Sequence, residues 1–123
     1  MLELAAKAAG IEWIPATTEK GIELEPVFGL WLRIHGEPSE HQRRRWNPLT
    51  DDGDALRLVV AIGFSDEEGV SIFLADKEDP TVVVRKGGKA GAMELAGNDP
   101  YAATRRAITR AAAAIQLAKE SGK

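Results

Sequence analysis

The chain has 123 residues, which fits a single domain, residues 1–123, with a core that needs no disulfide or metal ion. It contains no cysteine, which excludes disulfides, thiolate zinc sites and cysteine nucleophiles and fits a reducing cytosol. The formal net charge of -3 argues against non-specific binding to long nucleic acid. No apolar run approaches the roughly 20 residues of a membrane span, and Glu3 and Lys7 within the first apolar run argue against a signal peptide.

The N-terminal part of the chain predicts a helix and two strands. Apolar residues recur with helical spacing over residues 2–9, and Gly10 is typical of the position just after a helix end. A short strand is predicted near Ile11–Ile14. The segment GLWLRIH, residues 29–35, alternates an aliphatic face with a mixed face, which predicts a half-buried strand. The polar stretch 36–45 is interpreted as a loop.

A helix is predicted directly after Thr50. Thr50 is a good N-cap residue, and Asp51, Asp52 and Asp54 fill the first turn, where the helix dipole favours acids. Apolar residues then continue with helical spacing as far as Gly63.

A β-hairpin is predicted next. Val70–Ala75 and Thr81–Lys86 are rich in β-branched and aromatic residues and flank a polar turn. The glycine-rich stretch Gly87–Gly91 is interpreted as a flexible tip or connection.

The last predicted element is a long helix from Pro100 to about Lys119. Asn98 and Asp99 precede the proline, an arrangement typical of a helix start. The apolar stripe of this helix consists of Thr104, Ile108, Ala111 and Ile115. Because the strand connections are short, the element order favours an α+β fold, a small antiparallel sheet with packed helices, over βαβ units.

Two blocks of sequence resemble the phage α-β-α sandwich domain family, small proteins of tailed phages and prophages that mostly have no known function. The first block is W-N-P-L-x-D-x-x-x-A-x-x-L-V from Trp46 to Val59, and the second is A-I-x-R-A-A from Ala107 to Ala112. The resemblance covers about Trp46 to Ile115. It implies an α-β-α sandwich and a phage accessory protein in the host bacterial cytoplasm, and it carries over no catalytic residue. Size and element order are also similar to phage anti-defence sponges, which sequester nucleotide signals, but this is analogy at the level of fold.

A basic run precedes the tryptophan of the first block. Guanidinium groups of Arg43, Arg44 and Arg45 can pair with phosphate, and Trp46 can stack on a base. The alternative is a solvated loop that ends in a core tryptophan, which anchors the following helix.

The last helix offers a second set of candidate residues. Arg106 and Arg110 are four residues apart and share a face, Arg105 lies near the apolar stripe, and Tyr101 in the first turn could stack on a ring. These side chains could complete a phosphate site with the arginine run. The alternative is that the arginines pair with nearby acids.

Other chemistry is weakly indicated. The three aspartates lack the spacing of a calcium loop and are explained by the helix start. His35 and His41 have no serine positioned beside them as a nucleophile, because Ser39 in the same loop does not define a triad. The stretch RKGGKAGAM, with Arg85, Lys86 and Lys89, is not a P-loop; it is interpreted as a mobile hairpin tip or, alternatively, as a lid over an anion.

We therefore expect a non-enzymatic protein without a cofactor or metal. The first hypothesis is that it binds a small phosphate-containing ligand, such as a nucleotide immune signal, as an anti-defence protein. The alternative is a protein-interaction module that inhibits or adapts a host or virion protein. A concave site with converging arginines would favour the first, and a broad exposed apolar patch the second. A homo-oligomer is also expected, because the last helix carries alanines on several faces: Ala103, Ala107, Ala111 and Ala114.

Overall fold

The computed structural model describes residues 1–10, 13–15, 30–32, 45–65, 67–87 and 90–121. Its elements are α1 (Leu2–Ala8), β1 (Trp13–Pro15), β2 (Leu30–Leu32), β3 (Arg45–Trp46), α2 (Asp52–Gly63), β4 (Val70–Ala75), β5 (Thr81–Lys86), β6 (Ala90–Leu95) and α3 (Pro100–Glu120). The strands form two antiparallel sheets, with the orders β1-β2-β3 and β4-β5-β6. The predicted α+β fold with a small antiparallel sheet is confirmed.

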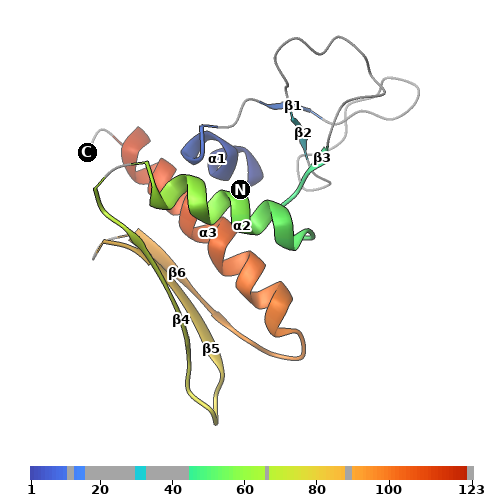
Figure 1. The fold of residues 1–123 in the computed structure, drawn as a ribbon, viewed down its shortest axis with the longest axis vertical. Helices are drawn as coiled ribbons and strands as arrows, with labels where there is room; N and C mark the ends of the chain where they lie inside the picture. The colour runs from blue at the N-terminus through green and yellow to red at the C-terminus, as the bar shows by residue number, and fades with distance from the viewer. Residues whose placement is uncertain (11–12, 16–29, 33–44, 66, 88–89, 122–123) are drawn as a thin grey trace.

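The helix α3 organises the packing (Figure 1). It lies along one face of the β4-β5-β6 sheet, where it contacts β5 and β6, and it also contacts α1 and α2. The core between these elements contains many alanines, and those on α3 (Ala103, Ala107, Ala111 and Ala112) are fully buried. Small side chains allow close approach of α3 to its neighbours. Ala103, Ala107 and Ala111 are therefore used inside the chain, and they do not supply the oligomer surface that we expected from them.

Capping groups set the starts of α2 and α3. Asp51, not Thr50, is the N-cap of α2, because its carboxylate accepts a hydrogen bond from the Asp54 N–H. Asp99 caps α3 in the same way by accepting from the Ala102 N–H, and Pro100 follows at the first helical position, as predicted. The helix over 2–9 is confirmed as α1, with Gly10 just beyond its end at a φ of 70°.

The hairpin of β4 and β5 has the predicted bounds, but the third strand was not predicted. Residues 90–95, AGAMEL, pair with β5, whereas we interpreted Gly87–Gly91 as a flexible tip or connection. Gly91 pairs with Arg85 in this strand, and the position requires glycine because a Cβ there would lie 2.4 Å from the Val84 carbonyl oxygen. The strand was missed because its alanine, glycine and glutamate residues have low β propensity.

The small sheet lies at the N-terminal end of the chain. The strand β2 falls within the predicted strand 29–35, and β1 overlaps the short strand predicted near Ile11–Ile14. Arg45 was interpreted as the last residue of a loop and Trp46 as the residue that ends it, but the two residues form β3 and pair with β2. Local sequence carries little signal for a two-residue strand, since only its partner defines it.

Candidate functional site

The arginine run is only partly placed by the structure. Arg43 and Arg44 lie outside the described residues, and of Arg45 the backbone alone is described, in β3 opposite Trp31. Trp46 is 1% exposed and belongs to the hydrophobic core. Its ring therefore anchors the chain before α2, as one of the two interpretations predicted, and it is not accessible to a ligand base.

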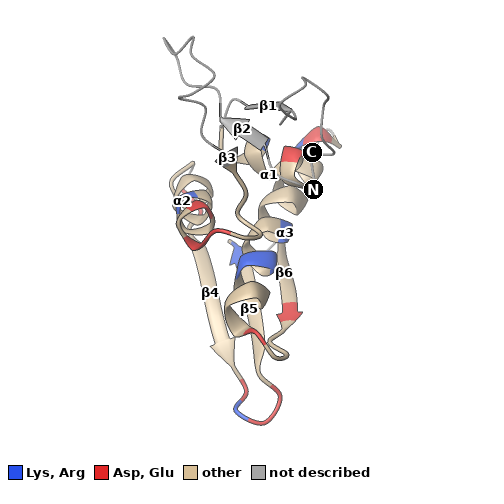
Figure 2. Cartoon of the chain, turned by 90° about the vertical axis from the view of Figure 1, so that its right-hand side faces the viewer, with Lys and Arg blue, Asp and Glu red and all other residues tan. Residues whose placement is uncertain are grey.

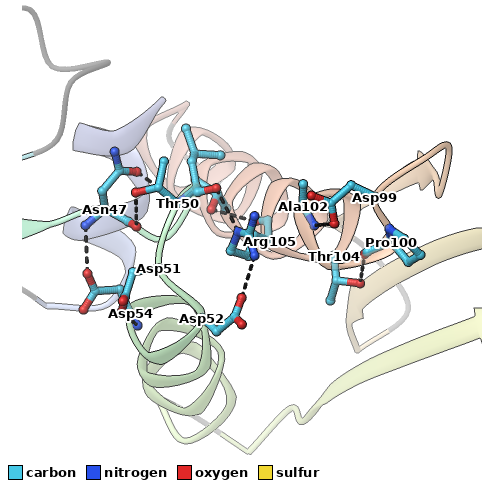
Figure 3. Close-up of polar contacts among 12 residues, drawn as sticks. Asn47, Thr50, Asp51, Asp52, Asp54, Asp99, Pro100, Ala102, Thr104 and Arg105 are labelled. Atoms are coloured by element: carbon cyan, nitrogen blue, oxygen red, sulfur yellow. Dashed lines mark hydrogen bonds and ion pairs between the residues drawn. The ribbon is translucent and has the colours of Figure 1, made fainter.

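The residues after Trp46 form a hydrogen-bonded turn that leads into α2 (Figure 3). The Asn47 backbone N–H donates to Asp54 Oδ2 at 2.9 Å, and the Asn47 side chain accepts from the Leu49 N–H at 3.0 Å. Asp54 is buried and also pairs with Arg57 at 3.2 Å. Together with the capping role of Asp51, these bonds explain the acids structurally. Within the described part of the chain, no group of three or more histidine or acidic side chains could hold a metal ion.

Arg105 ties α3 to the start of α2. Its Nε–H donates to the Leu49 carbonyl oxygen at 2.9 Å, and its Nη1 lies 2.6 Å from Asp52 Oδ1 (Figure 3). The side chain is mostly buried. Arg105 thus has two fixed partners and holds two helices together, which leaves its guanidinium little freedom to bind a ligand.

Arg106 and Arg110 converge on Glu94 of β6. Arg106 Nε lies 3.0 Å from Glu94 Oε1, and Arg110 Nη1 donates to Glu94 Oε2. Burial raises the pKa of Glu94, but the hydrogen bonds and charges of both arginines lower it by more, so the net pKa is below its ordinary value. The expected shared face of the two arginines is confirmed, and a carboxylate of the chain itself binds them.

Tyr101 lies on a different surface from the arginines. It is exposed and lines a groove of about 560 Å³ between the β4-β5 turn and the first turns of α3. Leu74, Pro80 and Val82 also line this groove, and Lys77 is the one cationic residue among the described residues that line it. Arg110 lies nine positions after Tyr101, about 14 Å along the helix axis, and Arg105, Arg106 and Arg110 do not line the groove. The groove therefore combines an aromatic wall with apolar walls, but the predicted arginines do not converge in it.

The glycine-rich candidate is also explained by structure. Lys86 is buried, and its Nζ donates to the carbonyl oxygens of Ile62 at 2.9 Å and Glu68 at 2.8 Å. It therefore links the sheet to the end of α2 and does not act as a lid over an anion. Lys89, His35, Ser39 and His41 lie outside the described residues.

The feature that sequence reasoning missed is an apolar outer face on the β4-β5-β6 sheet. Alternation along β5 turns Val82, Val84 and Lys86 toward the core, so their neighbours face away from α3. On that outer side Phe73, Val83 and Met93 lie directly opposite one another across the three strands, and Leu95 follows along β6. Phe73 is 54%, Met93 67% and Leu95 66% exposed.

The apolar outer face has a charged border. Asp76, Lys77, Glu78 and Asp79 form the β4-β5 turn beyond one end of the face, while β4 itself carries no charge (Figure 2). At the other end Arg85 of β5 is exposed, opposite Ser71 and Gly91. A signal for this face was present in AGAMEL, where the larger apolar residues alternate with Glu94; once Glu94 binds the arginines of α3, Met93 and Leu95 must point outward.

Comparisons with known proteins supply no further identification. No protein-family model, no curated protein and no solved structure matches this chain. None of the helices in the described residues is both long enough and apolar enough to cross a membrane. The geometry of the side chains is therefore the basis for assigning a function.

Proposed function

We propose that the protein is a non-enzymatic interaction module that binds an apolar surface of another protein through the outer face of the β4-β5-β6 sheet. The observation that carries this proposal is the row Phe73, Val83 and Met93, extended by Leu95. The solvated face of an antiparallel sheet ordinarily carries polar side chains. Contiguous exposed apolar side chains bordered by charges are typical of a protein-binding surface.

The chemistry of this face indicates the kind of partner. Phe73 offers a rigid aromatic anchor, and Met93 offers an unbranched, polarizable side chain that adapts to irregular surfaces. The charged turn and Arg85 form a polar border that would exclude water from the centre of the contact. The resemblance to small phage proteins supports a partner in the bacterial cytoplasm, a host or virion protein with an exposed apolar helix or sheet.

Quantitative capture of proteins from a bacterial lysate tests this proposal. The chain with Met93→Lys and Leu95→Lys should lose the captured partner, because two charges would be buried against an apolar surface. The matched control carries Leu56→Lys and Val60→Lys on the exposed side of α2, and it should capture the partner as the unmodified chain does. Equal capture by both double variants would refute a site on the sheet.

A phosphate-containing ligand remains the second proposal, supported by the convergence of Arg106 and Arg110 on one carboxylate. Glu94 lies where a phosphate oxygen would accept from the same two guanidinium groups. Glu94→Gln should therefore raise the affinity for such a ligand. A thermal-shift screen with cyclic dinucleotides, cyclic trinucleotides and ADP-ribose derivatives, run on the unmodified chain and on Glu94→Gln, tests this. No shift with either protein would reject it.

A further inference from the structure

The second notable feature of the sheet is the free edge of β4. The strand order β4-β5-β6 places β4 at the edge, and no strand of the described ranges pairs with its outer side. All of β4 after Val70 is exposed, although the strand contains Ile72, Phe73 and Leu74. Edge strands in natural proteins are usually interrupted by lysine, proline or a bulge, which prevent pairing with another chain. None of these interrupts the six residues of β4.

The pairing of β4 with β5 defines which backbone groups point outward. The Gly87 N–H donates to the Gly69 carbonyl oxygen, so Gly69 and Gly87 form a hydrogen-bonded pair. Hydrogen-bonded and non-hydrogen-bonded pairs alternate along an antiparallel ladder. In the register of β4 and β5, the N–H and C=O groups of Val70, Ile72 and Leu74 therefore point away from β5. These three residues present a regular set of donors and acceptors along the edge.

Both faces of this edge are apolar. Phe73 lies on the outer face, while Ile72 and Leu74 share the inner face with Val82 and Val84. Leu74 is nevertheless 73% exposed, because α3 contacts β5 and β6 and leaves β4 largely uncovered. The edge thus offers apolar side chains on two sides of one unpaired strand, which is the chemistry of an inner strand of a larger sheet.

We propose that β4 pairs antiparallel with β4 of a second copy of this chain, about a two-fold axis through Ile72. Residues directly opposite one another in an antiparallel pair point to the same side of the sheet. The inner faces of both copies therefore lie on one side only if the numbers of two opposed residues add up to an even number. A centre at Ile72 places Ile72 opposite itself and Val70 opposite Leu74 of the second copy. Val70, Ile72 and Leu74 of each copy then all form hydrogen bonds to the second copy. Asp76, whose φ of 72° departs from strand geometry, lies outside the paired segment.

Symmetry and shape support a second copy as the occupant. Antiparallel pairing about a two-fold axis lets the same edge of both copies supply all of the donors and acceptors. Ser71 faces Phe73 of the second copy, so a small side chain leaves room for a ring.

The pairing would join two three-stranded sheets into one of six strands. The outer faces of both copies would lie on the same side, so the rows of Phe73, Val83 and Met93 would form one continuous surface. This inference rests on the edge of β4 and stands independently of the proposed partner.

A single engineered cysteine tests the register directly, because the natural chain contains none. Opposed Cα atoms of a hydrogen-bonded antiparallel pair are about 5.5 Å apart, which suits a disulfide. Under mild oxidation Ile72→Cys should therefore form a covalent dimer. The matched control Leu95→Cys, exposed on the outer face at the other edge, should stay mostly monomeric. Rapid cross-linking of Leu95→Cys but not of Ile72→Cys would overturn the proposal.

Light scattering provides the second measurement. At about 100 μM protein, a dimer with a micromolar Kd is assembled. The unmodified chain and Leu95→Lys should have the dimer mass, whereas Leu74→Lys should have the monomer mass with an unchanged circular dichroism spectrum. If the unmodified chain has the mass of a monomer and no dimer is detected, the dimer is refuted. A dimer that persists in Leu74→Lys and dissociates in Leu95→Lys would refute edge pairing in favour of packing between outer faces.

Discussion

Replacing Trp46 tests how the chain anchors α2. The ring is fully buried among core residues, so Trp46→Ala should lower the free energy of unfolding by about 3–5 kcal/mol, the usual range for large aromatic residues. The indole Nε1–H is buried and has no hydrogen-bond partner in the described part of the chain, an arrangement that costs roughly 1–3 kcal/mol in the native state. Trp46→Phe removes this N–H and keeps most of the apolar surface, so we expect a loss of less than about 1.5 kcal/mol.

Urea titration followed by far-ultraviolet circular dichroism distinguishes the two variants. With a slope of about 2 kcal/mol/M, Trp46→Ala should lower the midpoint by roughly 2 M, and Trp46→Phe by less than about 0.8 M. The slope should be the same for all three proteins if the unfolded state is unchanged. A loss below about 0.5 kcal/mol for Trp46→Ala would refute the anchor, and equal large losses for both variants would refute the role of the unpaired N–H.

Three other contacts give predictions that unfolding measurements can check. Arg105→Gln should cost about 1–3 kcal/mol in urea, because the half-buried Leu49 carbonyl loses its donor; no loss would show that the link between α2 and α3 is dispensable. The lowered pKa of Glu94 contributes stability that is present above the unfolded value and is lost as pH falls through the folded value, so Glu94→Gln should flatten the pH dependence of stability below about pH 5. Gly91→Ala should be destabilising, since its Cβ would strike the sheet backbone, whereas Gly63→Ala meets only ordinary contacts in a helix and should be neutral or stabilising by about 0.5–1 kcal/mol. Thermal melts in which both alanine variants behave alike would contradict this difference.

The elements that local chemistry defines were predictable from the sequence. The hairpin bounds follow from two β-branched runs around a polar turn, and α3 follows from Asp99, Pro100 and the alanine-rich repeat. Trp46 as an anchor also followed from its place before a proline turn and a patterned helix. Each of these inferences needs only residues that are close in the chain.

The remaining features depend on partners distant in sequence. From its residue type, Glu94 is expected to face solvent. In the fold it faces α3 and binds Arg106 and Arg110, so its neighbours Met93 and Leu95 face outward. Arg105 is likewise expected to be a free cation from its residue type, but packing of α3 against the start of α2 gives it Leu49 and Asp52 as partners. The candidate phosphate site was assembled from residue types alone, and types do not reveal which cations the fold has already paired.

Site-specific photo-crosslinking in bacterial cells tests the outer face most directly. A photoreactive phenylalanine analogue replaces Met93 on the outer face or, as the control, Leu117 on α3, which is also exposed. We expect a discrete crosslink to a different protein from position 93 and none from position 117. The absence of any crosslink from position 93, or the same crosslinks from both positions, would contradict a partner-binding sheet.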